Sequence, residues 1–574
     1  MNRQVFGYLI PYWRRLVLVL AISLVSTATT LVIPYLSKDL IDNALVGRDF
    51  GALRRIVYWF IALGVLGFAL NVTSGLRYTR VSAEILFDMR LSLYAHLQRL
   101  SPRFYARTRL GDIVSRLNND ISEIQRVAAE AALAWVGNVL FLIGSLVMMV
   151  WLDWRLALIA LAPMPISLMA LAFYRRQLES RVADLRQRSA DIGSFLIETL
   201  QAASLVVASN AQQREQDRFR GLNGAFIDAL MRMQRVTYFA GGLPGTVLSI
   251  GSAIAFFYGG LRVIDGSLTL GTMGAFLAYQ MRVFAPAQAL MGLYASIATA
   301  RVSWSRVLEI LDAPIDVIER PDAKTIERPR GELTFESVTL GTDRSRVLDA
   351  VSFTASPGQI VALVGGSGVG KSTIAYLATR LLDPDAGAVR LDGEDLRGLT
   401  LTSVRRHIVL VEQEPTLLYA TIEENIRYVR PAASQDEVRL AAEAAGIAKF
   451  VLGLPHGYAT IVGERGLAVS AGERQRIALA RAFLADPAVL VMDEPTAALD
   501  AIAQRQVIDG SRSVMRGRTT ILITHRREVA MAADHVVVLD GARVVDSGSP
   551  SVLAERSAAF ARLFEIDRRA GALP

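Results

Sequence analysis

The sequence contains no cysteine and only four lysines among its 574 residues. The absence of cysteine excludes disulfide bonds and cysteine-ligated metal sites, although it does not fix the cellular compartment. Because lysine is scarce, arginine supplies almost all of the positive charge, and the formal net charge is +8. Charge of either sign is also missing from long stretches of the first half of the chain.

Six uncharged runs occupy that half, interrupted only by one arginine in the last of them. They span residues 16–37, 56–76, 131–152, 156–174, 236–261 and 266–300. About 20 apolar residues in a helix cross the hydrocarbon layer of a bilayer, and every run comes close to or exceeds that length. Buried helices of a large water-soluble enzyme would rarely leave six such runs in one half and none in the other. The sequence therefore predicts six transmembrane helices.

Positive charge is concentrated in two long loops, one after the second run and one after the fourth. Residues 77–126 contain nine arginines, and residues 175–235 contain ten. The positive-inside rule then places the N-terminus, both loops and everything after residue 300 in the cytoplasm. Nucleic-acid binding is not needed to explain the charge, so we expect an integral membrane protein, of a bacterial inner membrane, with lipids and no nucleic acid as partners.

The composition changes at residues 312–331, where three prolines lie among charged residues, as is typical of a linker. After it, short aliphatic strands at residues 360–364, 408–411, 489–492 and 520–523 alternate with helical segments. The sequence predicts a membrane helical bundle over 1–312, a linker over 313–330 and an α/β domain over 331–574. Regularly spaced apolar residues in both long loops predict that the membrane helices continue into the cytoplasm.

A glycine-rich loop of the form GxxxxGK[ST] follows the first of these strands. Its residues are Gly365, Gly366, Ser367, Gly368, Val369, Gly370, Lys371 and Ser372. The glycines let backbone N–H groups surround phosphate oxygens, Lys371 supplies a compact positive charge, and the Ser372 hydroxyl can bind Mg²⁺. The alternative is an ordinary turn, which the strand–loop–helix context disfavours. The loop predicts a P-loop domain that binds ATP and Mg²⁺.

Two carboxylates end the strand at residues 489–492. Asp493 is placed to organise Mg²⁺, and Glu494 to polarise the attacking water as a general base. In isolation, a strand ending in Asp-Glu is more often a solvated strand end. The glycine-rich loop earlier in the same domain favours the catalytic interpretation.

Together with the residues between them, these motifs resemble the ATP-binding cassette transporters of the exporter type. Residues 469–473, Val-Ser-Ala-Gly-Glu, are similar to the LSGGQ signature of that family, which other P-loop ATPases lack. Residues 283–286 and 300–311 look like the last membrane helix of exporters, so the resemblance covers nearly the entire chain. It implies a bundle of six transmembrane helices fused to a P-loop cassette.

The resemblance also implies further functional residues. Gln413 corresponds to the glutamine that senses Mg²⁺ and the membrane domain, and His525 to the switch histidine. Residues 463–466 look like the exporter X-loop, and residues 111–120 and 198–215 like the two coupling segments. Additional nucleotide-binding positions are Thr373, Thr342, Ser470, Gly472 and Asp500.

The sequence departs from the family pattern in two places. Thr342 stands where an aromatic residue normally stacks on adenine, so either stacking is lost, Arg344 or Arg346 covers the base, or the phosphate contacts suffice. In the signature, Ala471 and Glu473 replace glycine and glutamine. An alanine is tolerable there only where φ stays negative, and the change is either harmless or a mark of an asymmetric pair.

Because a signature acts on the nucleotide of the opposite subunit, the resemblance implies a dimer that couples ATP hydrolysis to the export of an amphipathic lipid, drug or peptide. A homodimer is favoured, since the chain has all the catalytic residues. The alternatives are a subunit of a heterodimeric exporter, an importer with an exporter-like fold, and a nucleotide-gated channel.

Arg282 is the one ionisable residue inside the six runs. An unpaired charge facing lipid is unfavourable, so Arg282 either faces a water-filled cavity, where it would favour anionic cargo, or is structural, snorkelling or pairing with a helix carbonyl.

Overall fold

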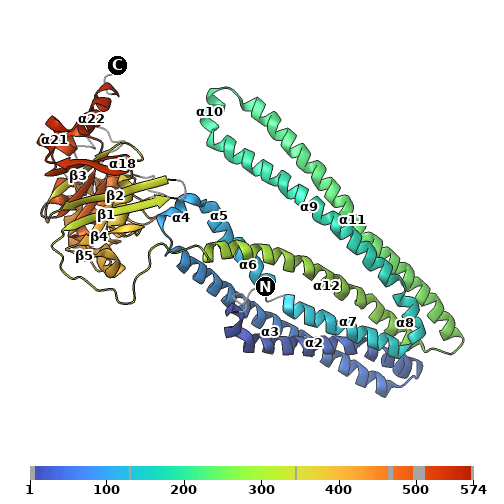
Figure 1. The fold of residues 1–574 in the computed structure, drawn as a ribbon. Coiled ribbons are helices and arrows are strands. Elements are labelled where there is room, and N and C mark those ends of the chain that lie inside the picture. Colours follow the sequence, from blue (N-terminus) through green and yellow to red (C-terminus); the bar gives the residue numbers. More distant parts are fainter. Residues whose placement is uncertain (1–6, 128–130, 343–344, 463–468, 495–510, 571–574) are drawn as a thin grey trace. The chain divides into compact units, whose positions relative to one another are not determined.

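The computed structural model describes residues 7–127, 131–342, 345–462, 469–494 and 511–570 (Figure 1). The chain divides into two compact units. One contains Met1–Ala95 and Gly111–Asp312, and we call it the helical unit. The other, the cassette unit, contains His96–Leu110 and Ala313–Pro574.

The helices that hold the uncharged runs form the helical unit, and all of them except the eight-residue α8 are long. These are α2 (Trp13–Asp39), α3 (Phe50–Leu97), α7 (Ala131–Leu152), α8 (Trp154–Leu161), α9 (Pro163–Gln201), α11 (Gln212–Ile264) and α12 (Leu270–Leu311). Short helical segments connect them: η1 (Ile10–Tyr12), η2 (Leu40–Val46), α5 (Leu110–Ser115), η3 (Arg116–Asp120), α6 (Ile121–Gln125) and α10 (Ala203–Ala208). The helices α3 and α9 run on through the long loops, which confirms the predicted helical extensions.

Within the described residues, five helices are long and apolar enough to cross a membrane, and they hold the first five predicted runs. The sixth run forms most of α12. The helical membrane fold is therefore confirmed, while the number six stays a prediction.

A buried cluster fixes one end of the helical unit, where α7, α8, α11 and α12 meet. Its members include Met149, Leu156, Ala255, Phe276 and Tyr279. From this cluster α9 and α11 run side by side to α10, which joins their other ends (Figure 1). An ion pair between Arg232 and Asp184, at 3.1 Å, links the two helices along the way.

The segment η2 contacts the beginning of α12 at the end of the helical unit that the positive-inside rule places on the outer side of the membrane. Asp42 accepts hydrogen bonds from the Gly271 backbone N–H at 2.7 Å and from the Thr269 hydroxyl at 2.6 Å. A Cβ atom at position 271 would lie 2.4 Å from the Lys38 carbonyl oxygen, so the approach requires glycine. The beginning of α12 is thus tied to the end of α2.

The cassette unit has an α/β fold, as the sequence predicts. Its strands are β1 (Leu333–Thr342), β2 (Ser345–Ala355), β3 (Ile360–Gly365), β4 (Ala386–Leu391), β5 (Glu394–Asp395), β6 (Ile408–Val411), β7 (Val489–Asp493), β8 (Thr519–Ile523), β9 (His535–Asp540) and β10 (Arg543–Gly548). Its helices are α4 (Pro102–Arg107), α13 (Lys371–Ala378), η5 (Leu396–Gly398), α14 (Leu401–His407), α15 (Ile422–Arg427), α16 (Gln435–Ala444), α17 (Ala448–Leu452), η6 (Gly457–Ala459), α18 (Ala471–Ala485), α20 (Arg527–Met531), α21 (Pro550–Arg556) and α22 (Ala558–Ala570).

Two sheets organise the cassette unit. The larger has the strand order β10-β9-β3-β8-β7-β6, in which every pairing but that of β10 is parallel, and the smaller, β2-β1-β4-β5, is antiparallel. Alternate residues of β7 enter different cores: Val489 and Val491 join one cluster, and Leu490 and Met492 the other. Burial on both faces explains why the parallel strands are continuously aliphatic.

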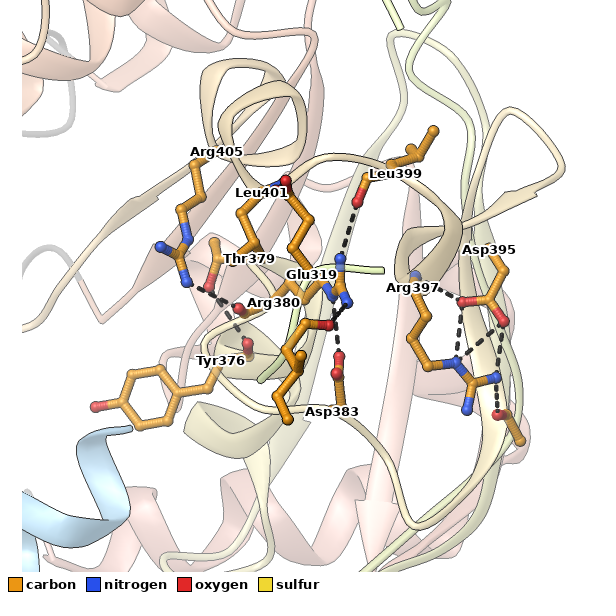
Figure 2. A network of polar contacts seen from close by, with 12 residues as sticks. Glu319, Tyr376, Thr379, Arg380, Asp383, Asp395, Arg397, Leu399, Leu401 and Arg405 are labelled. Atoms are coloured by element: carbon orange, nitrogen blue, oxygen red, sulfur yellow. Dashed lines mark hydrogen bonds and ion pairs between the residues drawn. The ribbon is translucent and has the colours of Figure 1, made fainter. Parts of the chain in front are cut away.

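The predicted linker is an ordered part of the cassette unit, and Arg380 holds it there (Figure 2). Arg380 is 1% exposed. Its guanidinium donates to the Ile318 carbonyl oxygen at 3.1 Å and to the Leu399 carbonyl oxygen at 2.9 Å, and it pairs with Asp383 at 3.1 Å. Glu319 accepts from the Leu401 backbone N–H at 2.6 Å. One buried cation therefore joins the linker to two loops of the cassette unit.

Candidate functional site

The predicted catalytic and phosphate-binding residues lie at one edge of the larger sheet. Because β3, β8, β7 and β6 are parallel, their C-terminal ends lie together. The glycine-rich loop leaves β3, the two carboxylates end β7, His525 follows β8, and Gln413 follows β6. Sheet topology thus brings together motifs that are far apart in the sequence.

The glycine-rich loop needs its glycines for two different reasons. Gly368 and Gly370 have φ of 79° and 102°, in the left-handed region. A Cβ atom at Gly370 would lie 2.9 Å from the Val347 carbonyl oxygen, whereas a Cβ atom at Gly366 or Gly368 would meet nothing within 4 Å. Gly370 therefore permits close packing below the loop, and the other two leave open space beside it.

Lys371 begins α13 and lies over the glycine-rich loop. Its Nζ donates to the carbonyl oxygens of Gly365 at 2.8 Å and Gly366 at 2.9 Å. Burial lowers the pKa of the ammonium, and the nearby charges of Glu494 and Asp493 raise it. A phosphate bound at the N-terminus of α13 would find this cation together with free backbone N–H donors.

Asp493 lies beside the serine of the loop. Burial raises the pKa of its carboxyl group, while a hydrogen bond from the Ser372 hydroxyl and the charge of Lys371 lower it. A partly buried carboxylate next to a hydroxyl is a suitable pair of oxygen ligands for a hard cation. Within the part of the chain that the structure describes, no group of three or more His, Cys, Asp or Glu side chains forms a metal cluster. A cation here would therefore need ligands from the nucleotide or from water.

Glu494 and His525 are in direct contact, which the sequence did not predict. Glu494 Oε2 lies 3.1 Å from His525 Nδ1. Glu494 has φ of 43°, an unusual conformation for a residue other than glycine, and its N–H donates to the Ile523 carbonyl oxygen at 3.0 Å. This turn places Glu494 beside the end of β8, where one oxygen of its carboxylate contacts His525.

Gln413 is exposed two residues beyond β6 and makes no side-chain hydrogen bond to the described residues. Its neighbour Glu412 was missed by sequence reasoning. Partial burial and the charge of Asp493 raise the pKa of the Glu412 carboxyl group. The signal in the sequence that could have identified Glu412 is its position at a strand end, next to Gln413. The site thus has three carboxylates: Asp493 and Glu494 lie near the ammonium of Lys371, and Glu412 lies near Asp493.

The signature segment forms the N-terminus of α18. Ser470 Oγ accepts from the Glu473 N–H at 3.3 Å, and Glu473 Oε2 accepts from the Ser470 N–H at 2.7 Å, which is a capping box. Ala471 is not among the residues with positive φ, so alanine fits the helix without strain. Gly472 is buried. Glu473 therefore has a structural role in this chain, in capping its own helix.

The region predicted to bind adenine contains an arginine that the sequence did not indicate. Thr342 ends β1, and Arg103 of the same unit donates from Nη2 to the carbonyl oxygen of the preceding residue, Gly341, at 3.2 Å. Arg346, one of the candidates for covering the base, pairs with Asp349 at 2.7 Å. Arg103 is thus a further candidate with a planar cation at this position.

Several predicted residues lie outside the described residues. These are Asp500, Arg344 and residues 463–466. Val369 and Thr373 are described, and Val369 packs against the core cluster beneath the glycine-rich loop. Ser367 lies within the loop itself.

The first predicted coupling segment is anchored to the C-terminal end of α12. Asp120 is buried and accepts from the Ser303 hydroxyl at 2.8 Å. Arg116 pairs with Asp112 at 2.9 Å and with Glu309 at 2.8 Å. A displacement of η3 would therefore be passed directly to the helix that leads into the linker.

Comparisons with known proteins agree with this architecture. Residues 16–287 match the family model described as ABC transporter transmembrane region, and residues 348–497 match the ABC transporter model. The ABC transporter ATP-binding protein YknV of Bacillus subtilis is 32% identical over 98% of this chain and 93% of its own length. An ATP-dependent lipid A-core flippase of Syntrophus aciditrophicus is 29% identical over 97% of this chain and 92% of its own.

A solved structure has a similar fold along nearly the whole chain. A bacterial Atm1-family ABC exporter with ATP bound superposes with a TM-score of 0.77 and 28% identity, covering 97% of this chain and 98% of that one. The helical unit is thus a transmembrane region of exporter type, and the cassette unit is an ATPase domain. The chain belongs to the ATP-binding cassette transporters, as an exporter-type half-transporter whose ATPase drives translocation.

Proposed function

We propose that the chain acts as a homodimeric exporter of an amphipathic substrate in a bacterial inner membrane. The observation that carries the proposal is the meeting of Lys371, Asp493 and the Glu494–His525 pair at one sheet edge. Residues 1–312 would form the transmembrane domain, 313–330 the linker and 331–574 the nucleotide-binding domain. Bacterial relatives support the choice of membrane.

Each group of site residues would have a separate role in ATP hydrolysis. The loop from Gly365 to Thr373 binds the phosphates, and Ser372, Asp493 and Gln413 hold Mg²⁺, which would neutralise phosphate charge. Glu494 accepts the proton of the water that attacks the γ-phosphate, and His525 keeps that carboxylate in position by their 3.1 Å contact. Thr342 lies at the base. Ser470, Gly472 and Asp500 would complete the site of the partner subunit.

Exposed apolar side chains support a dimer. Leu200, Leu205 and Val207, around α10, are 73%, 65% and 64% exposed. They lie at the end of the α9–α11 pair that the positive-inside rule places in the cytoplasm, where such a patch is unfavourable unless a partner covers it. Because one chain has a full set of catalytic residues, a second copy of it is sufficient as partner.

The test is reconstitution of the chain, expressed alone, into liposomes. We expect a dimer with two equivalent, active ATP sites and ATP-dependent movement of a fluorescent phospholipid analogue, an amphipathic drug or a peptide toward the side opposite the cassettes. The flippase relative makes the lipid the first cargo to try. Activity only after addition of a different half-transporter would establish the heterodimer instead. Movement in the reverse direction would establish an importer, and ATP-dependent ion conductance a channel.

A further inference from the structure

A cavity of about 820 Å³ lies between α2, α3 and α7 of the helical unit. Eighteen of the described residues line it, and none of these has a charged side chain. Nine have neutral polar side chains and four are glycines. This combination is unusual for residues that lie within predicted membrane spans, where apolar side chains dominate.

The wall that α2 contributes presents hydrogen-bond acceptors. The hydroxyls of Thr27, Thr29 and Thr30 donate to carbonyl oxygens of their own helix at 2.9, 2.7 and 3.0 Å. A hydroxyl that donates its proton in this way keeps its oxygen lone pairs for a ligand. These threonines therefore offer acceptors without leaving an unpaired donor in the membrane.

The other two walls each contribute an amide. Asn71 of α3 and Asn138 of α7 line the cavity, and neither side chain has a hydrogen bond to another described residue. Each carboxamide has two donor hydrogens and an acceptor oxygen. Unpaired polar groups at membrane depth are unfavourable and often mark a substrate path. The amides complement the threonine acceptors, because they add donors.

Two hydrogen bonds between α2 and α3 fix these walls relative to each other. Ser74 Oγ donates to the Val19 carbonyl oxygen at 3.3 Å, and Ser26 Oγ to the Gly67 carbonyl oxygen at 3.5 Å. The space between the helices is thus held by specific contacts, and its apolar lining includes Phe68.

We propose that this cavity binds the uncharged, multiply hydroxylated head group of an amphipathic substrate, such as a sugar or polyol on an alkyl chain. The proposal rests on the proposed function and names its substrate class. A phosphate or ammonium head group would find no counter-charge among the lining residues that the structure describes, whereas hydroxyls can both donate to the threonine oxygens and pair with the amides. The alkyl chain would lie against apolar lining such as Phe68.

The absence of cysteine makes the cavity directly testable. A Cβ atom at Gly137, which lines the cavity, would meet nothing within 4 Å, and the same holds for Gly242 in α11, which does not line it. Gly137→Cys and Gly242→Cys therefore give single-cysteine proteins without a steric clash. Both would be reconstituted and treated with a small maleimide, with or without octyl glucoside, octyl phosphate or octyltrimethylammonium below their micellar concentrations.

We expect octyl glucoside to slow the reaction of Gly137→Cys, and the two charged amphipaths to have little effect. The Gly242→Cys reaction should not change with any of them. Asn138→Ala should raise the octyl glucoside concentration needed for half-maximal protection about five- to tenfold, as expected for one lost hydrogen-bonding group. Gly137→Leu, which fills the space, should abolish stimulation of the ATPase by octyl glucoside and leave basal hydrolysis unchanged.

Equal protection by all three amphipaths would overturn the proposal, because it would show occupation by any alkyl chain, as by a bilayer lipid. If the Gly137→Cys thiol were protected without any ligand, and the protection disappeared on dilution of the dimer, a second copy of the chain would fill the space. That result would also overturn the proposal. A Gly137→Cys thiol that never reacts would mean that no accessible cavity exists. Failure of the proposed function would look different, since basal ATP hydrolysis and transport would then be missing in the unmodified chain.

Discussion

The cassette unit encloses its apolar side chains, whereas the helical unit displays them. In the cassette unit, Val489, Val491 and Ile521 of adjacent strands are all 0% exposed. In the helical unit, Tyr58 and Trp59 of α3 are 78% and 61% exposed. Both units contain long aliphatic segments, so the difference lies in what surrounds them.

The two media explain the contrast. In water, removal of apolar surface from the solvent stabilises a fold, and a cassette must therefore complete its own core. In a bilayer, lipid tails are as apolar as leucine, so helices associate through close packing and hydrogen bonds. Exposed apolar side chains of the helical unit therefore mark contact with lipid or with a second copy of the chain. The residues there that are informative about function are polar ones, such as Asn71 and Asn138.

The buried polar groups differ in the same way. The cassette unit buries the charged Arg380 completely, because three hydrogen-bonded partners compensate the loss of water. The helical unit uses neutral hydroxyls and amides around its cavity. Arg282, in α12, is exposed and has no ion pair among the described residues. Mutations can test whether ATP hydrolysis and thermal stability depend on the cassette unit, and the choice of cargo on the helical unit.

The largest effect should come from the cassette site. Glu494→Gln keeps the shape of the side chain but removes the base, so we expect turnover to fall about a hundredfold or more with ATP binding intact. His525→Ala should also impair hydrolysis, though less completely, since it removes only the contact that positions Glu494. Steady-state ATPase activity and nucleotide binding by the purified dimer measure both.

The control for this prediction is Glu555→Gln, on an exposed position of α21, which should leave turnover unchanged. Near wild-type hydrolysis by Glu494→Gln would show that another group is the base, and Glu412 would be the next to test.

The second prediction concerns stability of the cassette unit. Arg380→Met should destabilise it by about 3 kcal/mol, because the carbonyl oxygens of Ile318 and Leu399 and the Asp383 carboxylate lose a buried partner. The midpoint of thermal inactivation of the ATPase is the measurement. Arg390→Met breaks an ion pair with Glu336 at the protein surface and should change little. Equal effects of both substitutions would argue against a special role of the buried cation.

The third prediction concerns the base of the nucleotide. With Thr342 at the stacking position, GTP should compete with ATP more effectively than in relatives with an aromatic residue there. Thr342→Tyr should tighten ATP binding by roughly 1–2 kcal/mol, the scale of one base–aromatic stack. Titration with a fluorescent ATP analogue measures the change. If the affinity stays the same, another group covers the base, and weaker binding by Arg103→Ala would identify it.

The smallest expected effect is that of the substitution Arg282→Ala on folding and basal ATPase activity. Arg282→Ala removes an exposed side chain, so expression, stability and basal ATPase activity should be nearly unchanged. If Arg282 faces the translocation path, transport of an anionic amphipath falls while transport of a neutral one is retained. Vesicle assays with the two cargoes compare them. Equal losses would leave Arg282 with a purely structural role.

The sequence by itself determined the membrane helices, the cassette class and the position of the glycine-rich loop that is predicted to bind phosphate. A long uncharged run specifies a transmembrane span, because an ion in hydrocarbon is so unfavourable. The glycines of the loop specify their backbone conformation locally. Glu494 was also predicted individually, from its position at the end of a strand in a domain with a glycine-rich loop, and His525 was predicted through the family resemblance. These features depend on short stretches of chain, which is why one sequence was sufficient to predict them.

Only the tertiary structure decided which of these residues meet. Parallel strand order places His525 against Glu494, and a buried Arg380 fastens the predicted linker. The cavity depends on the spacing of three helices, two of which meet through single hydrogen bonds from Ser26 and Ser74. Such contacts join residues distant in the chain, and their geometry follows from packing, for which local sequence patterns have no signal.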